Sequence, residues 1–166
     1  RHQGHAFDED GAWAASGQPI EPLLDALLQE PFFAQAPPKS TGRDLFHLDW
    51  LMPNLDATWA TADIQATLAE LTVETVARSL EQHGPGIARL FVCGGGARNA
   101  HLMRRLAARL PGVAVTTTAD LGVPVDQVEA AAFAWLAERF VTRQAGNLPE
   151  VTGARGRRVL GALHPA

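Results

Sequence analysis

Cysteine is almost absent from this chain of 166 residues, and long hydrophobic runs are lacking. The single cysteine, Cys93, excludes an internal disulfide and is typical of a reducing compartment. Because it lies in an apolar run, we expect a small buried hydrophobic side chain rather than a nucleophile. No segment approaches the ~20 apolar residues of a membrane span, and no signal-peptide pattern opens the chain. We therefore expect a cytoplasmic protein with no membrane partner.

An excess of positive charge is also lacking, because 14 Lys and Arg residues stand against 18 Asp and Glu residues, a formal net charge of −4. Nucleic acids and anionic membranes need a basic surface, so neither is expected as the main partner. Two arginine clusters are expected to be solvated faces rather than anion sites: Arg104, Arg105 and Arg109, and Arg155, Arg157 and Arg158. The apolar content of 46% predicts a globular domain.

The histidines do not form a metal-binding pattern. His2 and His5 precede Asp8 and Asp10 and loosely imitate a metal cluster, but chain ends rarely hold a fixed ligand set. The other histidines lie far apart, with no H-x-x-x-H spacing. We therefore expect no structural metal.

Helical spacing of apolar residues dominates the first half of the sequence. The expected elements are two short helices within residues 8–33, a loop over 34–43, a helical turn within 44–51 and a long helix over 61–83. Gly17 and Pro19 separate the two short helices. Thr61 is the expected N-cap of the long helix, and the helix dipole favours Asp63 in its first turn.

The second half predicts a small parallel sheet. The expected elements are a buried strand over 88–95, a helix that begins at Asn99, a strand over 113–118, a helix over 125–144 and an irregular tail over 146–166. The last helix is expected to turn one apolar face to a core: Val128, Ala132, Trp135, Leu136 and Phe140. Two parallel strands are a poor sheet by themselves. The predicted fold class is therefore a helix-rich α/β domain with few parallel strands, whose other strands lie outside these 166 residues.

The segment 90–106, LFVCGGGARNAHLMRRL, runs from a predicted strand through three glycines into an amphipathic helix. Free amide N–H groups and the helix dipole at such a junction favour an anion. Glycine also lets a ligand approach where a Cβ atom would collide. Three interpretations are open: a tight turn capped by Asn99, a dinucleotide site, and the nucleotide cleft of a kinase.

Two familiar phosphate-binding patterns fit poorly. The pattern G-x-G-x-x-N over residues 94–99 is one residue short of the dinucleotide fingerprint, although Asp120 lies where a ribose-binding acid would be expected. That fingerprint normally opens a sheet with more units downstream, and only one strand and one helix follow here. A P-loop is excluded because PPKSTGR, residues 37–43, is preceded by Ala34 where a glycine is required. The loop can equally be a proline-stiffened turn.

The motif FVCGGGARN resembles the adenosine motif of the sugar-kinase, Hsp70 and actin superfamily, whose members pair two ribonuclease-H-like lobes around ATP. Further segments resemble, in chain order, the C-terminal part of the anhydro-N-acetylmuramic acid kinase family: DEDGAWAASG, LLQEPFFAQAPPKSTGRDLF, DIQATLAELT, VCGGGARNAHLMRRLAARLPG, VTTTADLGVPVDQVEAAAFAWLA and GNLPEVTGA. The resemblance covers essentially all 166 residues. It implies part of a ribonuclease-H-like, actin-like ATPase lobe.

Members of that family act in cell-wall recycling. They add water to the anhydro bridge of 1,6-anhydro-N-acetylmuramic acid and transfer the γ-phosphoryl group of ATP to the 6-oxygen, with Mg²⁺. The family's base is an aspartate in a Gly-Phe-Asp-Thr-Gly-Pro-Gly-Asn segment, which this chain does not contain. The resemblance therefore implies that residues 1–166 are the C-terminal, nucleotide-side part of a two-lobe sugar kinase, inactive in isolation. It also implies that the full-length enzyme is a homodimer.

The resemblance assigns site residues within the chain. The nucleotide-binding residues are expected to be Gly94, Gly95, Gly96 and Asn99 on the adenosine side, with Lys39 and Arg43 facing the nucleotide or the interlobe cleft. A role in folding alone is the alternative for the loop 37–43. Glu129 is expected to face the sugar pocket and to help activate the water, with Asp126 as the second candidate. A favourable contact with the helix dipole is a sufficient alternative reason for Glu129. The alternative function is a non-catalytic helical α/β domain that offers a subunit interface.

Overall fold

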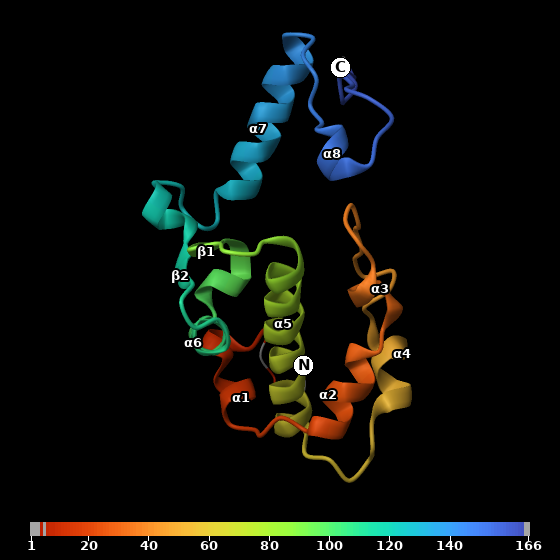
Figure 1. Cartoon of the computed structure of the whole chain (residues 1–166), viewed down its shortest axis with the longest axis vertical. Coiled ribbons are helices and arrows are strands. Elements are labelled where there is room, and N and C mark those ends of the chain that lie inside the picture. Colours follow the sequence, from red (N-terminus) through yellow and green to blue (C-terminus); the bar gives the residue numbers. More distant parts are fainter. Residues whose placement is uncertain (1–3, 5, 165–166) are drawn as a thin grey trace.

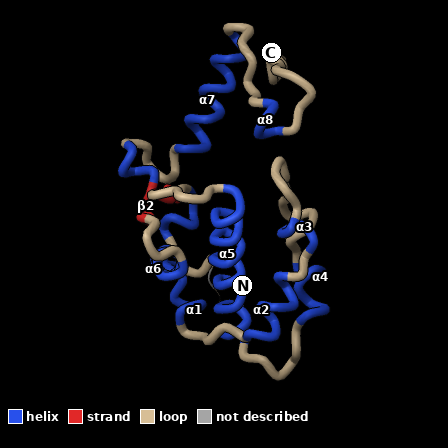
Figure 2. The backbone as a smooth tube through the Cα atoms, in the orientation of Figure 1, coloured by secondary structure: helices blue, strands red, loops and turns tan. Residues whose placement is uncertain are grey.

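The computed structural model describes residue 4 and residues 6–164, which form helices around one long helix and a small sheet beside it (Figure 1). The helices are α1 (Ala12–Ala15), α2 (Glu21–Leu28), α3 (Pro31–Ala34), α4 (Leu48–Leu51), α5 (Thr61–His83), α6 (Ala100–Arg109), α7 (Val128–Val141) and α8 (Pro149–Thr152). The strands are β1 (Arg89–Val92) and β2 (Ala114–Thr117). Short 3-10 turns lie at Glu9–Gly11, Met52–Asn54, Gly94–Arg98 and Thr118–Leu121. Helix and loop make up most of the backbone (Figure 2).

Helix α5 is the centre of residues 6–110, which we call the helical body. Helices α1, α2 and α6 all pack against it. Its predicted span of 61–83 is confirmed, and its apolar spacing buries Leu71, Val73 and Ala77. The predicted threonine cap is wrong, because the chain enters the helix one residue earlier, at Ala60, without a side-chain cap.

Residues near the start of α5 form hydrogen bonds to the segment that connects α1 and α2. The Asp63 carboxylate accepts the backbone N–H of Gln18 at 2.8 Å. The buried Thr67 hydroxyl accepts the N–H of Ile20 at 2.9 Å and donates to the carbonyl of Asp63 at 2.7 Å. A Cβ atom on Gly17 would lie 2.2 Å from a backbone oxygen of α5, so only glycine allows this close crossing.

A leucine core lies between α2, α4 and α5. Its buried members are Leu23, Leu27, Leu51 and Leu71. Removing such side chains from water is the main favourable term in folding, at about 1.5–3 kcal/mol for each fully buried leucine. This core holds the first half of the chain together.

Arginine side chains bridge α6 to α5. Arg105 forms a fork with Glu70, with nitrogen–oxygen distances of 2.9 and 2.8 Å. Arg109 donates to Glu74 at 2.6 Å and to Glu81 at 2.7 Å. The Arg109 guanidinium lowers the pKa of Glu74, which in turn raises the pKa of Arg109. These two arginines are therefore interhelical ion-pair partners, whereas the sequence predicted a solvated face.

Strands β1 and β2 form the predicted parallel pair, with α6 as the crossover. Their register aligns Arg89 with Ala114 and Val92 with Thr117. The strands are shorter than the predicted spans, and their central residues are only half-buried. Cys93 is exposed, so the prediction of a buried thiol is wrong. The physical reason is that, within the described chain, this two-stranded sheet is only partly covered, whereas parallel strands are normally covered on both faces.

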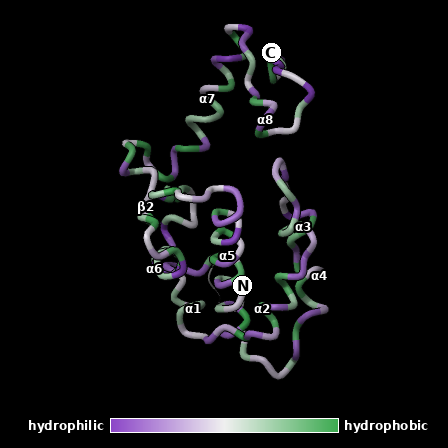
Figure 3. The backbone as a smooth tube through the Cα atoms, in the orientation of Figure 1, coloured by the Kyte–Doolittle hydropathy of each residue, from purple (hydrophilic) through white to green (hydrophobic). Residues whose placement is uncertain are grey.

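Residues 118–164, which we call the C-terminal arm, extend away from the helical body (Figure 1). No described residue of this arm is buried, and apolar residues run along α7 (Figure 3). The predicted inward face of α7 is confirmed only in part: Val128, Leu136 and Phe140 are half-buried, whereas Ala132 and Trp135 are exposed. Phe133, outside the predicted face, is 64% exposed. The helix also begins at Val128 rather than Val125, because residues 125–127 form a turn. No helix of the described residues is long and apolar enough to cross a membrane.

The tail contains one short helix where irregular structure was predicted. Pro149 opens α8 at its first position, and Gly153 follows it in the left-handed conformation, at φ +70°. These are the positions that proline and glycine favour at helix ends. A Cβ atom on Gly153 would lie 3.0 Å from the Pro38 ring, so the tail touches the loop 37–43.

Candidate functional site at the glycine turn

The turn Gly94–Arg98, which we call the glycine turn, follows directly after β1. Gly94 has a φ of +68°, a conformation that side-chain-bearing residues rarely adopt. Gly95 has no such strain, yet an added Cβ atom there would meet nothing within 4 Å. Packing within the described chain therefore does not explain Gly95, and the space over this backbone is open to a ligand.

Helix α6 begins beside the glycine turn with a firmly held cap. Asn99 is the N-cap, and its side-chain oxygen accepts the N–H of Leu102 at 2.8 Å, as predicted. The 3-10 turn Glu9–Gly11 packs on this cap, since a Cβ atom on Gly11 would lie 2.3 Å from the Asn99 side-chain oxygen. The helix therefore presents its partial positive charge at a fixed place next to the open glycine backbone.

The end of β2 adds a polar group to the same edge. Thr118 follows β2 directly, and its hydroxyl oxygen is buried without a hydrogen-bond partner among the described residues. Since Val92 aligns with Thr117, Thr118 lies level with the start of the glycine turn. Ligands of open α/β sheets bind at the carboxyl ends of the strands. Sequence reasoning missed Thr118, although its place just after a predicted strand is a usable signal.

The glycine turn is joined to the beginning of α7. The N–H of Gly94 donates to the carbonyl of Val125 at 2.9 Å. The Arg98 guanidinium forms a fork with the Asp126 carboxylate, with Nε 3.0 Å from Oδ1 and a second bond to Oδ2. Each partner favours the charged form of the other, so the pKa of Asp126 is lowered and that of Arg98 is raised. Asp126, predicted as a substrate ligand, here has Arg98 as its partner.

Glu129 lies three residues after Asp126, in the exposed first turn of α7. It has no hydrogen bond or ion pair within the described residues. The fold thus gathers the three glycines, Asn99 and Asp126 at one edge of the sheet, with Arg98 as the connecting residue, and Glu129 follows in the adjoining first turn of α7. The pairing of Arg98 with Asp126 spans 28 positions of sequence and has no local signal.

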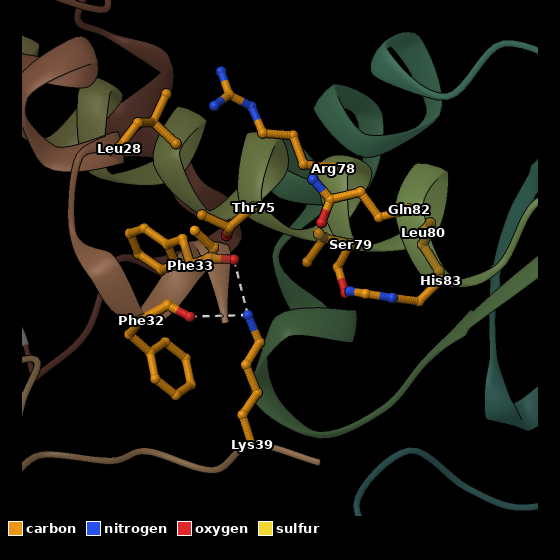
Figure 4. Close-up of a pocket in the computed structure, with 12 residues that line it drawn as sticks. Leu28, Phe32, Phe33, Lys39, Thr75, Arg78, Ser79, Leu80, Gln82 and His83 are labelled. Carbon is orange, nitrogen blue, oxygen red and sulfur yellow. Dashed lines mark hydrogen bonds between the residues drawn. The ribbon is translucent and has the colours of Figure 1, made fainter. Parts of the chain in front are cut away.

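Lys39 and Arg43 lie elsewhere. The Lys39 ammonium donates to the carbonyls of Phe32 and Phe33 at 3.0 and 2.9 Å, at the end of α3 (Figure 4). It also lies 4.9 Å from the centroid of the Phe32 ring. Arg43 is exposed without an ion-pair partner among the described residues. Helix α5 separates this region from β1 and the glycine turn (Figure 1).

A pocket of about 430 Å³ lies between α3, Lys39 and the second half of α5 (Figure 4). Its floor is apolar, with Leu28, Phe33 and Val76 among its lining residues. Arg78, which also lines it, points away from Lys39 in the close-up, so the charged groups do not converge on one point.

Metal-binding groups do not gather in the described part of the chain. No cluster of three or more His, Cys, Asp or Glu side chains lies within residues 4 and 6–164. The histidines His2 and His5 lie outside the described residues. The Asp8 carboxylate caps α1 by accepting the N–H groups of Trp13 and Ala14 at 2.8 and 3.0 Å.

An open glycine turn at the carboxyl end of a parallel strand, leading into a capped helix, defines a helix-rich α/β domain suited to phosphate-bearing ligands. Comparison with known proteins narrows this class. The sequence matches the anhydro-N-acetylmuramic acid kinase family over residues 1–166. The chain belongs to this family, which favours the kinase interpretation of the glycine turn over the dinucleotide one.

Similar curated proteins carry the family's name. The anhydro-N-acetylmuramic acid kinase of Cupriavidus pinatubonensis is 58% identical over 166 residues, which cover 98% of this chain and 44% of that protein. The protein of the same name from Burkholderia lata is 58% identical over 171 residues, with 99% of this chain and 45% of that protein covered. The one from Nitrosomonas europaea is 51% identical over 166 residues, with 100% and 46% covered. The chain therefore spans a little under half the length of these relatives.

Proposed function

We propose that this chain is the nucleotide-side part of an ATP-dependent kinase that hydrolytically opens 1,6-anhydro-N-acetylmuramic acid and phosphorylates its 6-oxygen. The single observation that carries the proposal is the open space over Gly95, beside the capped start of α6. In phosphoryl transfer the protein mainly positions the groups and stabilises charge, so an unobstructed backbone beside the start of a helix suits the task. The family membership supplies the substrate.

The glycine turn would hold the adenosine side of ATP, with Asn99 fixing the start of α6. Gly95 offers backbone without a side chain, open to an approaching ligand. Mg²⁺ would accompany ATP and neutralise the charge of the phosphates. We assign no metal ligand to this chain, because its described residues contain no cluster of metal-binding side chains.

Glu129 would face the sugar. Its carboxylate can accept a hydrogen bond from a sugar hydroxyl, and it can help to take a proton from the water that opens the anhydro bridge. Its exposed place in the first turn of α7, beside the glycine turn, supports this role. The main catalytic base would lie in the preceding portion that the relatives carry, together with the rest of a ribonuclease-H-like lobe. A cytoplasmic homodimer completes the proposal.

The loop 37–43 would act in two ways. Lys39 secures it to the end of α3 through two carbonyl groups, which is a folding role. Since α5 separates Arg43 from the glycine turn, Arg43 would face the interlobe cleft, or the nucleotide from the far side of that cleft. Arg43→Ala is expected to weaken ATP binding and leave the melting temperature unchanged, while Lys39→Ala is expected to lower the melting temperature. The reverse pattern would assign the nucleotide contact to Lys39.

The test uses the full-length enzyme, meaning this sequence joined to the preceding portion that its relatives carry. Gly95→Val should raise the KM for ATP about tenfold or more, because a branched side chain fills the open space over the turn. Ala108→Val is the matched control, since Ala108 is exposed on α6 away from the turn. An unchanged KM for ATP in Gly95→Val would refute the assignment of the glycine turn.

The second candidate function is a non-catalytic α/β domain that provides a subunit interface. The uncovered apolar side chains of α7 favour it. Size measurement of the purified chain distinguishes the two, because an interface module should self-associate through α7 and lose that association in Phe133→Glu. If the chain is instead part of a kinase, the same side chains of α7 should be covered by the preceding portion that the relatives carry, and not by a second copy of this chain.

A further inference from the structure

Both ends of the glycine turn form hydrogen bonds with the segment before α7, at the consecutive residues Val125 and Asp126. Gly94, its first residue, donates its N–H to the carbonyl of Val125, and Arg98, its last residue, forms the fork with Asp126. Two attachment points fix both the position and the direction of the connected segment. The segment is the turn that leads into α7 and Glu129.

Little else in the described chain holds the beginning of α7. No residue of that helix is buried, and Glu129 itself makes no hydrogen bond or ion pair within the described residues. The tail lies against the second half of this helix, at Leu136 and Phe140, so the position of its first turn depends on the contacts at its start. The place of Glu129 relative to the glycine turn therefore depends on residues 125 and 126.

We propose that the Arg98–Asp126 ion pair is a positioning latch, which holds the first turn of α7, and with it Glu129, at a set distance from the nucleotide-binding glycine turn. This inference rests on the proposed function. Arg98 and Asp126 are positioning residues, because they act through the glycine turn and Glu129. The latch would link the nucleotide side of the site to the sugar side.

The geometry of the pair suits this task. A guanidinium fork binds a carboxylate through two parallel hydrogen bonds, which fixes direction as well as distance. The two side chains are 66% and 54% exposed, so solvent screens the pair and it contributes little to overall stability. The pair can therefore orient the start of α7 without adding much to the stability of the fold.

The first test measures the latch without any ligand. Spin labels are placed at Ala108→Cys on α6 and Glu138→Cys on α7, in a Cys93→Ser background, and the distance distribution is measured by pulsed electron paramagnetic resonance. The unmodified pair should give a narrow distribution, and Arg98→Gln and Asp126→Asn should broaden it. The charge swap Arg98→Asp with Asp126→Arg should narrow it again. Arg104→Gln, which removes an exposed arginine of α6 that has no ion pair among the described residues, should leave the distribution unchanged.

The second test uses the full-length enzyme. Arg98→Gln and Asp126→Asn should lower kcat about tenfold, because small displacements of a reacting group cost large factors in rate, and leave the KM for ATP and the melting temperature unchanged. The charge swap should recover part of the lost kcat, which a purely structural role does not predict.

Failure of the latch and failure of the proposed function give different results. If Gly95→Val and Glu129→Gln impair the enzyme while Arg98→Gln keeps the narrow distribution or the original kcat, the latch is wrong and the proposed function stands. If neither Gly95→Val nor Glu129→Gln has an effect, the proposed function is wrong. A broad distribution in the chain with its Arg98–Asp126 pair intact would also refute the latch.

Discussion

The helical body and the C-terminal arm obey the same sequence rules and reach different degrees of packing. In the helical body, α5 and α2 enclose a leucine core, and every buried residue of the described chain precedes residue 111. In the arm, α7 is as apolar as a core helix, yet none of its residues is buried. The difference teaches that apolar patterning shows that a helix needs a partner and does not show where that partner lies.

The comparison also separates stability from function. The helical body holds the leucine core and the ion pairs between α5 and α6, whereas Glu129 and Asp126, which we propose as site residues, lie in the arm. Functional residues often lie on weakly packed segments beside a stable scaffold. Substitutions in the helical body should therefore lower the free energy of unfolding, whereas those at Glu129 and Asp126 should lower turnover.

The largest expected effect is a loss of stability in the body. Leu27 is 1% exposed in the leucine core, so Leu27→Ala should lower the free energy of unfolding by about 2–5 kcal/mol. Phe133→Ala in the arm should change it by less than about 0.5 kcal/mol, because this larger side chain is mostly exposed. Urea denaturation of the 166-residue chain measures both. Similar losses for the two variants would break the contrast between body and arm.

The next effect concerns the arm and catalysis. In the full-length enzyme, Glu129→Gln should lower turnover at least about tenfold, a cost of roughly 1.4 kcal/mol, because the amide cannot take a proton. Glu138→Gln is the matched control, an exposed glutamate on the same helix. Neither change should alter the melting temperature. Full activity of Glu129→Gln would leave the helix dipole as the sufficient reason for this carboxylate.

A smaller effect sharpens the comparison through pH. The Arg109 guanidinium lowers the pKa of Glu74 in the folded body, so the pair stabilises the fold fully above about pH 4.3, the ordinary pKa of glutamate. This contribution is lost as the pH falls through the lower folded pKa. Arg109→Gln should therefore cost about 1 kcal/mol at pH 7 and less at acidic pH. Thermal melts of both proteins between pH 7 and pH 3 measure this, and an equal loss at every pH would contradict it.

Local signals predicted the elements of the helical body well. The repeat of apolar residues that predicts α5 and the Asn99 cap of α6 each depend on residues three or four positions apart. The parallel pairing of the strands follows from the crossover helix between them. The glycine turn and its relation to a family were also readable from the motif. These features depend on neighbours in sequence, which is why they could be predicted.

Features that depend on distant partners could not be predicted. The contact of Lys39 with the α3 carbonyls and the fork between Arg98 and Asp126 join residues with no shared motif. The exposure of Cys93 and the open face of α7 follow from which segments cover them, and the covering segments are not encoded at those positions. These failures concern distant partners, whereas the wrong Thr61 cap and the unpredicted helix α8 are errors about local elements.

The central claim is that the glycine turn and the start of α7 form one side of a kinase site that the relatives' preceding portion completes. The most direct measurement is phosphorylation of 1,6-anhydro-N-acetylmuramic acid with ATP and Mg²⁺, first by the 166-residue chain alone and then after addition of the separately expressed preceding portion. We predict no turnover by the chain alone, turnover by the mixture, and loss of that turnover when the chain carries Gly95→Val. Turnover by the isolated chain, or a mixture that associates without turnover, would contradict the claim.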